Sequence, residues 1–147
     1  MAVWRSRNVP LLEPYLGGLG AGILLHVFVP WRLVPTEWIG HAVGWPLVFA
    51  GGALALWAVT AAGVVDLEEP DRVVVAGPYG RSRNPMYVAW GLAYVGVSFL
   101  VNTACPLVVL PAAMALTHVT VLREEHELER RFGAEYRDYR SRTRRYL

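Results

Sequence analysis

Charged residues are absent from three long stretches of the chain, which alternate with shorter polar segments. These stretches run from residue 15 to 31, from 38 to 65 and from 84 to 122. The third has 39 residues and would measure about 58 Å as a helix, at about 1.5 Å per residue. That is about twice a hydrocarbon core of about 30 Å, so it should hold two spans. We therefore predict four membrane-spanning helices, at about residues 15–31, 39–63, 86–101 and 104–122.

The longest polar connection, residues 66–83, lies between the second and third predicted spans. Gly77, Pro78 and Gly80 should turn the chain sharply there, because glycine tolerates positive φ and proline fixes φ. The dipeptide at 102–103, Asn-Thr, is the natural hairpin between the third and fourth spans.

The arginine-rich segment after Leu122 should continue the fourth span as a helix beyond the membrane. Gly133 is expected to interrupt that helix. Its apolar side chains recur every three or four residues, which predicts an amphipathic tail: Leu128, Phe132, Tyr136 and Tyr139. The predicted fold is an all-α integral membrane protein, one membrane domain over 1–147, with four transmembrane helices, a cytoplasmic loop and a C-terminal amphipathic helical tail.

Two glycine pairs have GxxxG spacing, Gly18 with Gly22 in the first span and Gly40 with Gly44 in the second. Small residues at this spacing let helices approach closely where lipid supplies no hydrophobic driving force. We expect these glycines to serve helix packing rather than to line a ligand path.

Composition and charge agree with a membrane protein. Hydrophobic residues make up 54% of the chain and the mean hydropathy is +0.32. All 14 basic residues are arginine: two precede the first span, three lie between the second and third, eight follow the fourth, and Arg32 alone lies in the first hairpin. The positive-inside bias places both termini and the central loop in the cytoplasm, and the expected location is the cell inner membrane. The net charge of +2 gives no reason to expect nucleic acid as a partner.

The first span also has features of a signal peptide, because Arg5 and Arg7 precede an apolar stretch. No clear small-residue cleavage site follows it, and three further spans do. We expect a retained helix.

Several kinds of chemistry are disfavoured by the residue types present. The single cysteine, Cys105, excludes an internal disulfide and a cysteine-based zinc cluster. The four histidines match neither HExxH nor ExxH spacing, and the chain has no GxSxG and no P-loop. We expect no metal site and no covalent nucleophile.

Glu124 and Glu125 stand where the fourth predicted span leaves the membrane. Carboxylates are costly there unless they are hydrated, paired or bound to something. Neighbours on a helix point about 100° apart, so both cannot serve one face. One can then bind a ligand while the other pairs with an arginine. The spacing fits equally a solvated helix end with pairs such as Glu127 and Arg131.

The motif GPYGRSRNPMY is followed by a hydrophobic hairpin, then by REEHEL and RRFGAEYRDYRSRTRRYL. This order resembles the isoprenylcysteine carboxyl methyltransferase and phospholipid methyltransferase superfamily, integral membrane enzymes that use S-adenosylmethionine. The resemblance covers about residues 70–147, the half that would bind the cofactor. The two N-terminal spans are similar only in being helices.

The resemblance implies a cytoplasm-facing pocket for S-adenosylmethionine, with S-adenosylhomocysteine as the product. The 77–87 loop, the ends of the third and fourth spans and the following helix would form it. Glu125, or its neighbour Glu124, would bind the ribose hydroxyls or the ammonium group. The other implied cofactor-binding residues are Gly77, Pro78, Tyr79, Asn84, Pro85, Tyr87 and His118. Asn84 departs from the animal and yeast isoprenylcysteine branch, which has histidine there, so no cationic contact is expected from it.

The same resemblance implies methyl transfer to a lipophilic acceptor from the inner leaflet, an isoprenylcysteine-type carboxylate or a related lipid, with the amine of a phospholipid as the alternative. Arg145 or Arg123 would orient a carboxylate, and Glu124 would take the proton of an amine. Membrane lipids are the other expected partners. An NADPH-dependent membrane reductase and a non-enzymatic helical membrane protein are alternatives from other classes. The acceptor, the methylated atom and the oligomeric state stay open.

Overall fold

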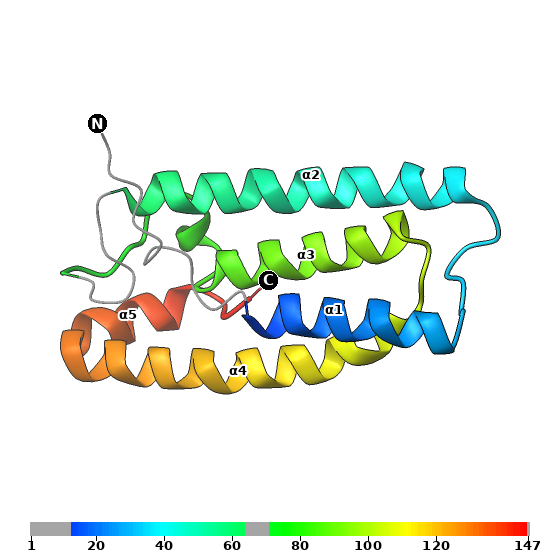
Figure 1. The fold of residues 1–147 in the computed structure, drawn as a ribbon. Coiled ribbons are helices and arrows are strands. Elements are labelled where there is room, and N and C mark those ends of the chain that lie inside the picture. Colours follow the sequence, from blue (N-terminus) through cyan, green and yellow to red (C-terminus); the bar gives the residue numbers. More distant parts are fainter. Residues whose placement is uncertain (1–12, 64–70, 147) are drawn as a thin grey trace.

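The computed structural model describes residues 13–63 and 71–146, and the regular structure in these segments is helical (Figure 1). The elements are α1 (Glu13–Phe28), α2 (Glu37–Ala62), the 3₁₀ turn η2 (Gly77–Gly80), α3 (Pro85–Leu100), α4 (Cys105–Phe132) and α5 (Ala134–Arg142). These segments contain no β-strand, and a single isolated bridge joins Ser82 to Arg144. The predicted all-helical class is confirmed.

Helices α1 to α4 run side by side along the molecule, and α5 folds back beside the end of α4 (Figure 1). α2 packs chiefly on α3, and α1 packs chiefly on α4. The predicted hairpin forms at Asn102, which has a φ of 50°. Its side-chain oxygen accepts hydrogen bonds from the backbone N–H groups of Leu33 and Val34, at 3.2 and 2.9 Å. One side chain thus ties the α1–α2 connection to the α3–α4 hairpin.

Close helix contacts form at the predicted glycine pairs. A Cβ added at Gly22 would lie 2.4 Å from the Cα of Pro106 in α4. One added at Gly44 would lie 2.8 Å from the carbonyl oxygen of Gly96 in α3. Real Cβ atoms do not approach so closely, so each helix meets its partner through backbone. The prediction that these glycines serve helix packing is confirmed for Gly22, Gly40 and Gly44, whereas a Cβ at Gly18 would come no closer than 3.4 Å to its neighbours.

Replacing Gly44 with alanine should lower the free energy of unfolding by about 1–3 kcal/mol, the usual cost of overpacking a close contact. Gly52→Ala is the matched control, because Gly52 lies on the same helix and has nothing within 4 Å of its Cβ position. The control should be neutral, or more stable by up to about 1 kcal/mol, since alanine favours helix. Denaturant unfolding in detergent micelles measures both. Equal stability of the two variants would contradict the packing role.

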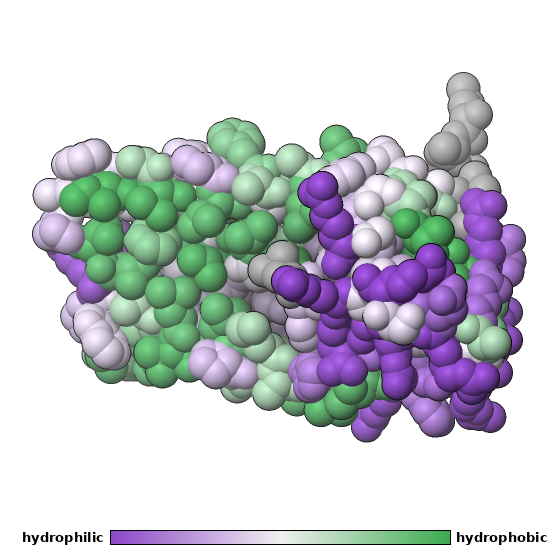
Figure 2. All heavy atoms as spheres, turned by 180° about the vertical axis from the view of Figure 1, so that it is seen from behind, coloured by the Kyte–Doolittle hydropathy of each residue, from purple (hydrophilic) through white to green (hydrophobic). Residues whose placement is uncertain are grey.

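The face of the molecule in Figure 2 divides into an apolar part over the helices and a polar end, which is the end where α5 lies in Figure 1. Large apolar side chains face outward on three helices, with Leu24 63% exposed, Phe49 68% and Leu116 63%. α2 and α4 have 26 and 28 residues and are long and apolar enough to cross a membrane. α1 and α3 have 16 residues each, below the usual requirement of about 20. Two candidate spans therefore indicate membrane association, and the four-span topology stays a prediction.

α4 continues without a break beyond Leu122, the last uncharged position of its run, as far as Phe132. Gly133, with a φ of 54°, ends it, and α5 begins at the next residue. The predicted helical extension and its interruption are both confirmed. Glu124 and Glu125 consequently sit within a continuous helix, and each side chain leaves it in a fixed direction.

Candidate functional site

Glu125 of α4 is a carboxylate, 6% exposed, that two arginines hold from distant parts of the chain. Arg83, in the loop after η2, donates to Oε1 from Nη2 at 2.9 Å and from Nε at 3.1 Å. Arg145, beyond α5, donates from Nη2 to Oε2 at 2.9 Å and from Nε to both oxygens at 3.1 and 3.2 Å. Forked arginine–carboxylate contacts are among the strongest polar pairs in proteins. This clamp joins the loop, α4 and the C-terminal segment.

Glu125 lies beyond the uncharged run of α4, at the polar end of the molecule. Burial raises the pKa of its carboxyl group, but the hydrogen bonds from Arg145 and Arg83 outweigh burial, and the net pKa is lowered from 4.5. The Arg83 side chain is only 8% exposed. Glu125 is therefore ionised at neutral pH, and both of its oxygens are engaged by guanidinium groups.

Glu124 points to a different partner. The hydroxyl of Tyr87, buried in the first turn of α3, donates to its Oε1 at 3.0 Å. Burial raises the pKa of Glu124, the Tyr87 hydrogen bond partly opposes this, and the charge of Glu125 raises it further, so the net pKa lies above 4.5. A carboxylate with a raised pKa is suited to accept a proton. The two neighbouring glutamates thus serve different faces, as helix geometry predicts.

Residues 143–146, which we call the C-terminal strap, lie across the start of α3. The backbone N–H of Arg83 donates to the carbonyl oxygen of Arg144 at 2.8 Å. The side-chain amide of Asn84 donates to the carbonyl oxygen of Arg145 at 3.1 Å. The strap is thus held by the same loop that supplies Arg83 to the clamp.

The end of the strap contacts α4 at a position nearer to the middle of that helix than Glu125. The hydroxyl of Tyr146 lies 2.9 Å from Nδ1 of His118, within hydrogen-bond distance. Tyr146 also packs against a buried cluster whose members are Tyr15, Tyr87, Tyr94 and Val121. We call the group of polar contacts around Glu124 and Glu125 the polar cluster. His118 precedes Glu125 by two helical turns, on the same side of α4, so its contact with Tyr146 lies at the inner edge of this cluster.

The turn η2 packs on α2 rather than on the polar cluster. Gly77 has a φ of 58°, and a Cβ there would lie 2.8 Å from that of Ala61. Pro78 and Tyr79 are buried. The carbonyl oxygen of Tyr79 accepts a hydrogen bond from the hydroxyl of Tyr139 in α5 at 2.7 Å. These residues fix the loop between α2 and α5.

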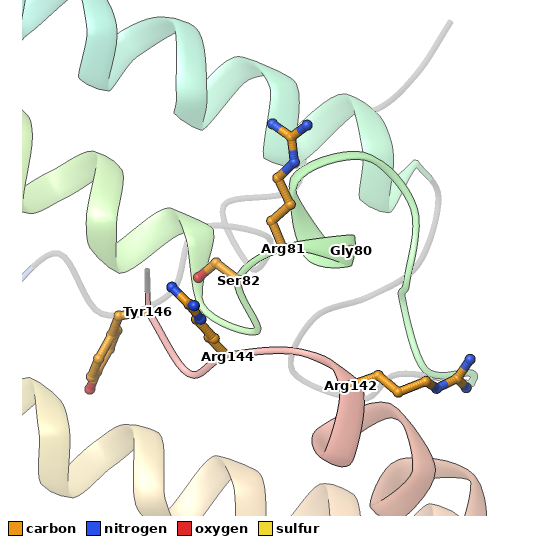
Figure 3. Close-up of a pocket in the computed structure, with 6 residues that line it drawn as sticks. All are labelled: Gly80, Arg81, Ser82, Arg142, Arg144 and Tyr146. Atoms are coloured by element: carbon orange, nitrogen blue, oxygen red, sulfur yellow. The ribbon is translucent and has the colours of Figure 1, made fainter.

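A hollow of about 390 Å³ opens between the loop and the strap (Figure 3). In Figure 3 the ring of Tyr146 points toward α4 and Arg144 lies beside Ser82, whereas Arg142 points away. The volume is within the range of small-molecule sites, about 300–1,000 Å³. Its lining residues are Gly80, Arg81, Ser82, Arg142, Arg144 and Tyr146.

The structure gathers most of the predicted site residues at the polar end of the bundle. Those in the cluster or at its edge are Asn84, Tyr87, His118, Glu124, Glu125 and Arg145. Pro85 is buried where α3 begins, and the three predicted residues of η2 lie on the α2 side. Arg123 is exposed on α4. Glu127 lies 3.6 Å from Arg130, rather than pairing with Arg131 as its spacing also allows.

Sequence reasoning misses Arg83 as the partner of Glu125, and Tyr146 as the partner of His118. The distribution of the arginines is explained by membrane topology, so it gives no sign that the side chain of Arg83 is buried. A signal is available for Arg83, which stands directly before Asn84 in the motif. Tyr146 carries none, because nothing in its spacing connects it with α4.

A family model described as phospholipid methyltransferase matches residues 39–135, which is more than half of the chain. The chain belongs to this family. The match confirms the resemblance seen in the motifs. It includes α3, α4 and the loop that carries Arg83, and it ends before the strap. Together with the apolar α2 and α4, membership of the phospholipid methyltransferase family indicates a membrane methyltransferase.

One relative is the nickel-cobalt-cadmium resistance protein NccN of Alcaligenes xylosoxydans xylosoxydans, 36% identical over 71 residues. The alignment covers 48% of this chain and 33% of that protein, so the chain spans about a third of the relative's length. No solved structure matches. Within residues 13–63 and 71–146, no group of three or more His, Cys, Asp or Glu side chains is placed to hold a metal ion.

Proposed function

We propose that the protein transfers a methyl group from S-adenosylmethionine to the amine headgroup of a membrane phospholipid, at the cytoplasmic face of the inner membrane. One observation carries the proposal. In a chain of the phospholipid methyltransferase family, Glu124 binds α3, and Glu125 binds both the loop and the strap. Both glutamates lie just beyond the uncharged stretch of α4. A reaction site there would reach both a water-soluble cofactor and a lipid.

The proposed topology has four spans with both termini in the cytoplasm. α1 and α3 lie alongside the two longer helices (Figure 1) and would span with them. Short spans are accommodated by local thinning of the bilayer at modest cost. The concentration of arginine before α1, between α2 and α3, and after α4 supports this orientation.

The residues around Glu124 fit S-adenosylmethionine. A sulfonium cation is attracted to a carboxylate and to aromatic faces, which Glu124, Tyr87 and Tyr146 supply within the cluster. The amide of Asn84 and the hollow beside the strap would receive the polar remainder of the molecule. S-adenosylmethionine would supply the electrophilic methyl group for an in-line displacement.

Glu124 would take the proton that the amine loses when it is methylated. Its raised pKa brings the proton affinity of the carboxylate closer to neutral pH, where a general base works best. The hydroxyl of Tyr87, at 3.0 Å, holds the carboxylate in one orientation. The arginine clamp on Glu125 fixes the loop and strap around it, and alignment of this kind is the main contribution expected of the protein.

The two arginines that were expected to orient a carboxylate are placed elsewhere, which favours an amine acceptor. Arg145 uses Nε and Nη2 on Glu125, and Arg123 is exposed on α4. A carboxylate acceptor would instead approach the negative charge of Glu124, and like charges repel. An isoprenylcysteine-type carboxylate is therefore the second candidate.

Calorimetric titration of the full-length protein in detergent tests the proposal, with S-adenosylhomocysteine as the ligand and NADPH as the control. We expect saturable micromolar binding of S-adenosylhomocysteine, no binding of NADPH, and methyl transfer to phosphatidylethanolamine but not to a prenylcysteine. Binding of NADPH alone would indicate a reductase. Binding of neither would favour a non-enzymatic helical protein, and methylation of the prenylcysteine would establish the second acceptor.

A further inference from the structure

The side chain of Tyr146, at the end of the C-terminal strap, lies between the hollow and the contacts of Glu124. It lines the hollow together with residues of the loop, and its ring points toward α4 (Figure 3). The same side chain packs against the buried cluster that contains Tyr87, whose hydroxyl donates to Glu124. A ligand that enters through the hollow would therefore meet Tyr146 before it meets Glu124.

The strap is held in place mainly by hydrogen bonds. The carbonyl oxygen of Arg145 accepts one from the hydroxyl of Ser82 at 3.3 Å and one from the side-chain amide of Asn84 at 3.1 Å. Among the four side chains of the strap only Thr143 is buried, and Arg144 is exposed. A segment with few buried apolar side chains opens at a lower free energy than a packed core. The strap can therefore open while the helices stay folded.

Helix α5, which precedes the strap, is fixed more firmly. Tyr136 is 1% exposed, and the hydroxyl of Tyr139 donates to the carbonyl oxygen of Tyr79 at 2.7 Å. The helix ends at Arg142, and Thr143 has extended backbone, with a φ of −123° and a ψ of 132°. Opening is thus confined to the residues that follow α5.

The two arginines of the clamp differ in how readily they can leave Glu125. The side chain of Arg83 is 8% exposed and also donates to the carbonyl oxygen of Arg140 at 3.2 Å. The side chain of Arg145 is 35% exposed, so water can replace the carboxylate as its partner. Glu125 would keep Arg83 when Arg145 leaves, and no buried charge would be left without a partner. The contact on the strap side is therefore the one that can break at modest cost.

We propose that the strap is a gate over the Glu124 site and that Tyr146 is its gating side chain. The contact of Tyr146 with His118 and the contact of Arg145 with Glu125 hold the gate closed. Opening admits the cofactor through the hollow, and closing holds it and excludes water, as other lids do. This inference rests on the proposed function and adds how ligand exchange at that site is controlled.

The first test measures the association and dissociation rates of S-adenosylhomocysteine by rapid mixing with the full-length protein in detergent. Tyr146→Phe keeps the ring and removes the hydroxyl that contacts His118. It should raise both rate constants about three- to tenfold, the usual worth of one net hydrogen bond, and change the dissociation constant by less than about twofold. The affinity is kept because the closed form is weakened equally with and without the ligand. Arg145→Met should act in the same direction.

The second test needs no ligand. The backbone N–H of Arg83 donates to the carbonyl oxygen of Arg144 at 2.8 Å, so its hydrogen exchange reports opening of the strap. Exchange at this position should become faster in Tyr146→Phe and in Arg145→Met. Arg142→Met is the matched control, because Arg142 lines the same hollow but points away from it and binds Asp138 of its own helix (Figure 3). The control should keep the wild-type exchange and both wild-type rate constants.

The outcomes separate the gate from other roles of Tyr146. If Tyr146→Phe raises only the dissociation rate and weakens binding, Tyr146 is a ligand contact and the gate is overturned. Unchanged exchange at Arg83, or unchanged rate constants in a protein that binds S-adenosylhomocysteine, would overturn the gate and leave the methyltransferase proposal in place. If wild type binds no S-adenosylhomocysteine, the proposed function fails and the gate for its cofactor fails with it.

Discussion

Replacing Glu125 with alanine should lower the free energy of unfolding by about 3–5 kcal/mol, the usual cost of removing one partner of a buried ion pair. The variant leaves the guanidinium of Arg83 without its carboxylate at 8% side-chain exposure. Arg145, whose side chain is 35% exposed, can regain water and should contribute less to the loss. Thermal and denaturant unfolding in detergent measure the effect.

Glu127→Ala is the control on the same helix. Glu127 and Arg130 are both 69% exposed and 3.6 Å apart, and an exposed pair of this kind contributes about 0–1 kcal/mol. The double variant Glu125→Ala with Arg83→Met should recover part of the loss, because it removes the stranded charge as well. If Glu125→Ala costs no more than Glu127→Ala, the clamp does not hold the loop and strap together.

The same comparison should depend on pH in one direction. The pKa of Glu125 is lowered from 4.5 in the folded protein, so its stabilisation is present in full above the unfolded value and is lost as pH falls through the folded one. The difference between wild type and Glu125→Ala should therefore be constant near neutral pH and shrink below about pH 4.5. A difference that persists unchanged into acid would contradict an ionised carboxylate as its source.

The helices could be predicted from the distribution of charge and proline. The spans expected at 39–63 and 86–101 correspond to Glu37–Ala62 and Pro85–Leu100, because charged residues and a proline mark their ends. The first helix ends at Phe28, earlier than the expected residue 31, since proline at position 30 lacks the N–H that helix continuation needs. Whether a helix can cross the membrane depends on its length. α1 and α3, with 16 residues each, are shorter than the about 20 residues that a span usually needs.

The position of the site could be predicted from the sequence, but not which of its residues bind one another. The motifs place both glutamates, Asn84 and Tyr87 near the membrane boundary. Two of the 14 arginines bind Glu125, and they are separated from it in the sequence by 42 residues (Arg83) and 20 residues (Arg145). Which arginines do so depends on how the loop and the strap cross α4. Gly77 likewise contacts α2, in the half of the chain where the resemblance carries no residue roles. Such choices belong to tertiary packing, which local patterns do not encode.

Replacing Glu124 with glutamine should lower kcat/KM for methyl transfer to an amine lipid by about 100-fold or more, the usual contribution of a general base. Glutamine keeps the shape and can still accept the hydrogen bond from Tyr87, but it cannot take up the proton. Because burial opposes the charge of Glu124, the variant should unfold at the wild-type temperature or above. Radiolabelled methyl transfer and thermal unfolding, measured on one preparation, separate lost chemistry from lost folding.

The pH profile then distinguishes proton transfer from positioning. Since the pKa of Glu124 lies above 4.5, the wild-type rate should fall as pH is lowered through that raised value, and the residual rate of Glu124→Gln should lack this limb. Tyr87→Phe keeps the carboxylate and removes a hydrogen bond that lowers its pKa, so its limb should move to higher pH with a smaller loss of rate. If Glu124→Gln retains wild-type kcat/KM, or keeps the acid limb, Glu124 is not the proton acceptor. A carboxylate acceptor, whose methylation releases no proton, would then fit the result better than an amine.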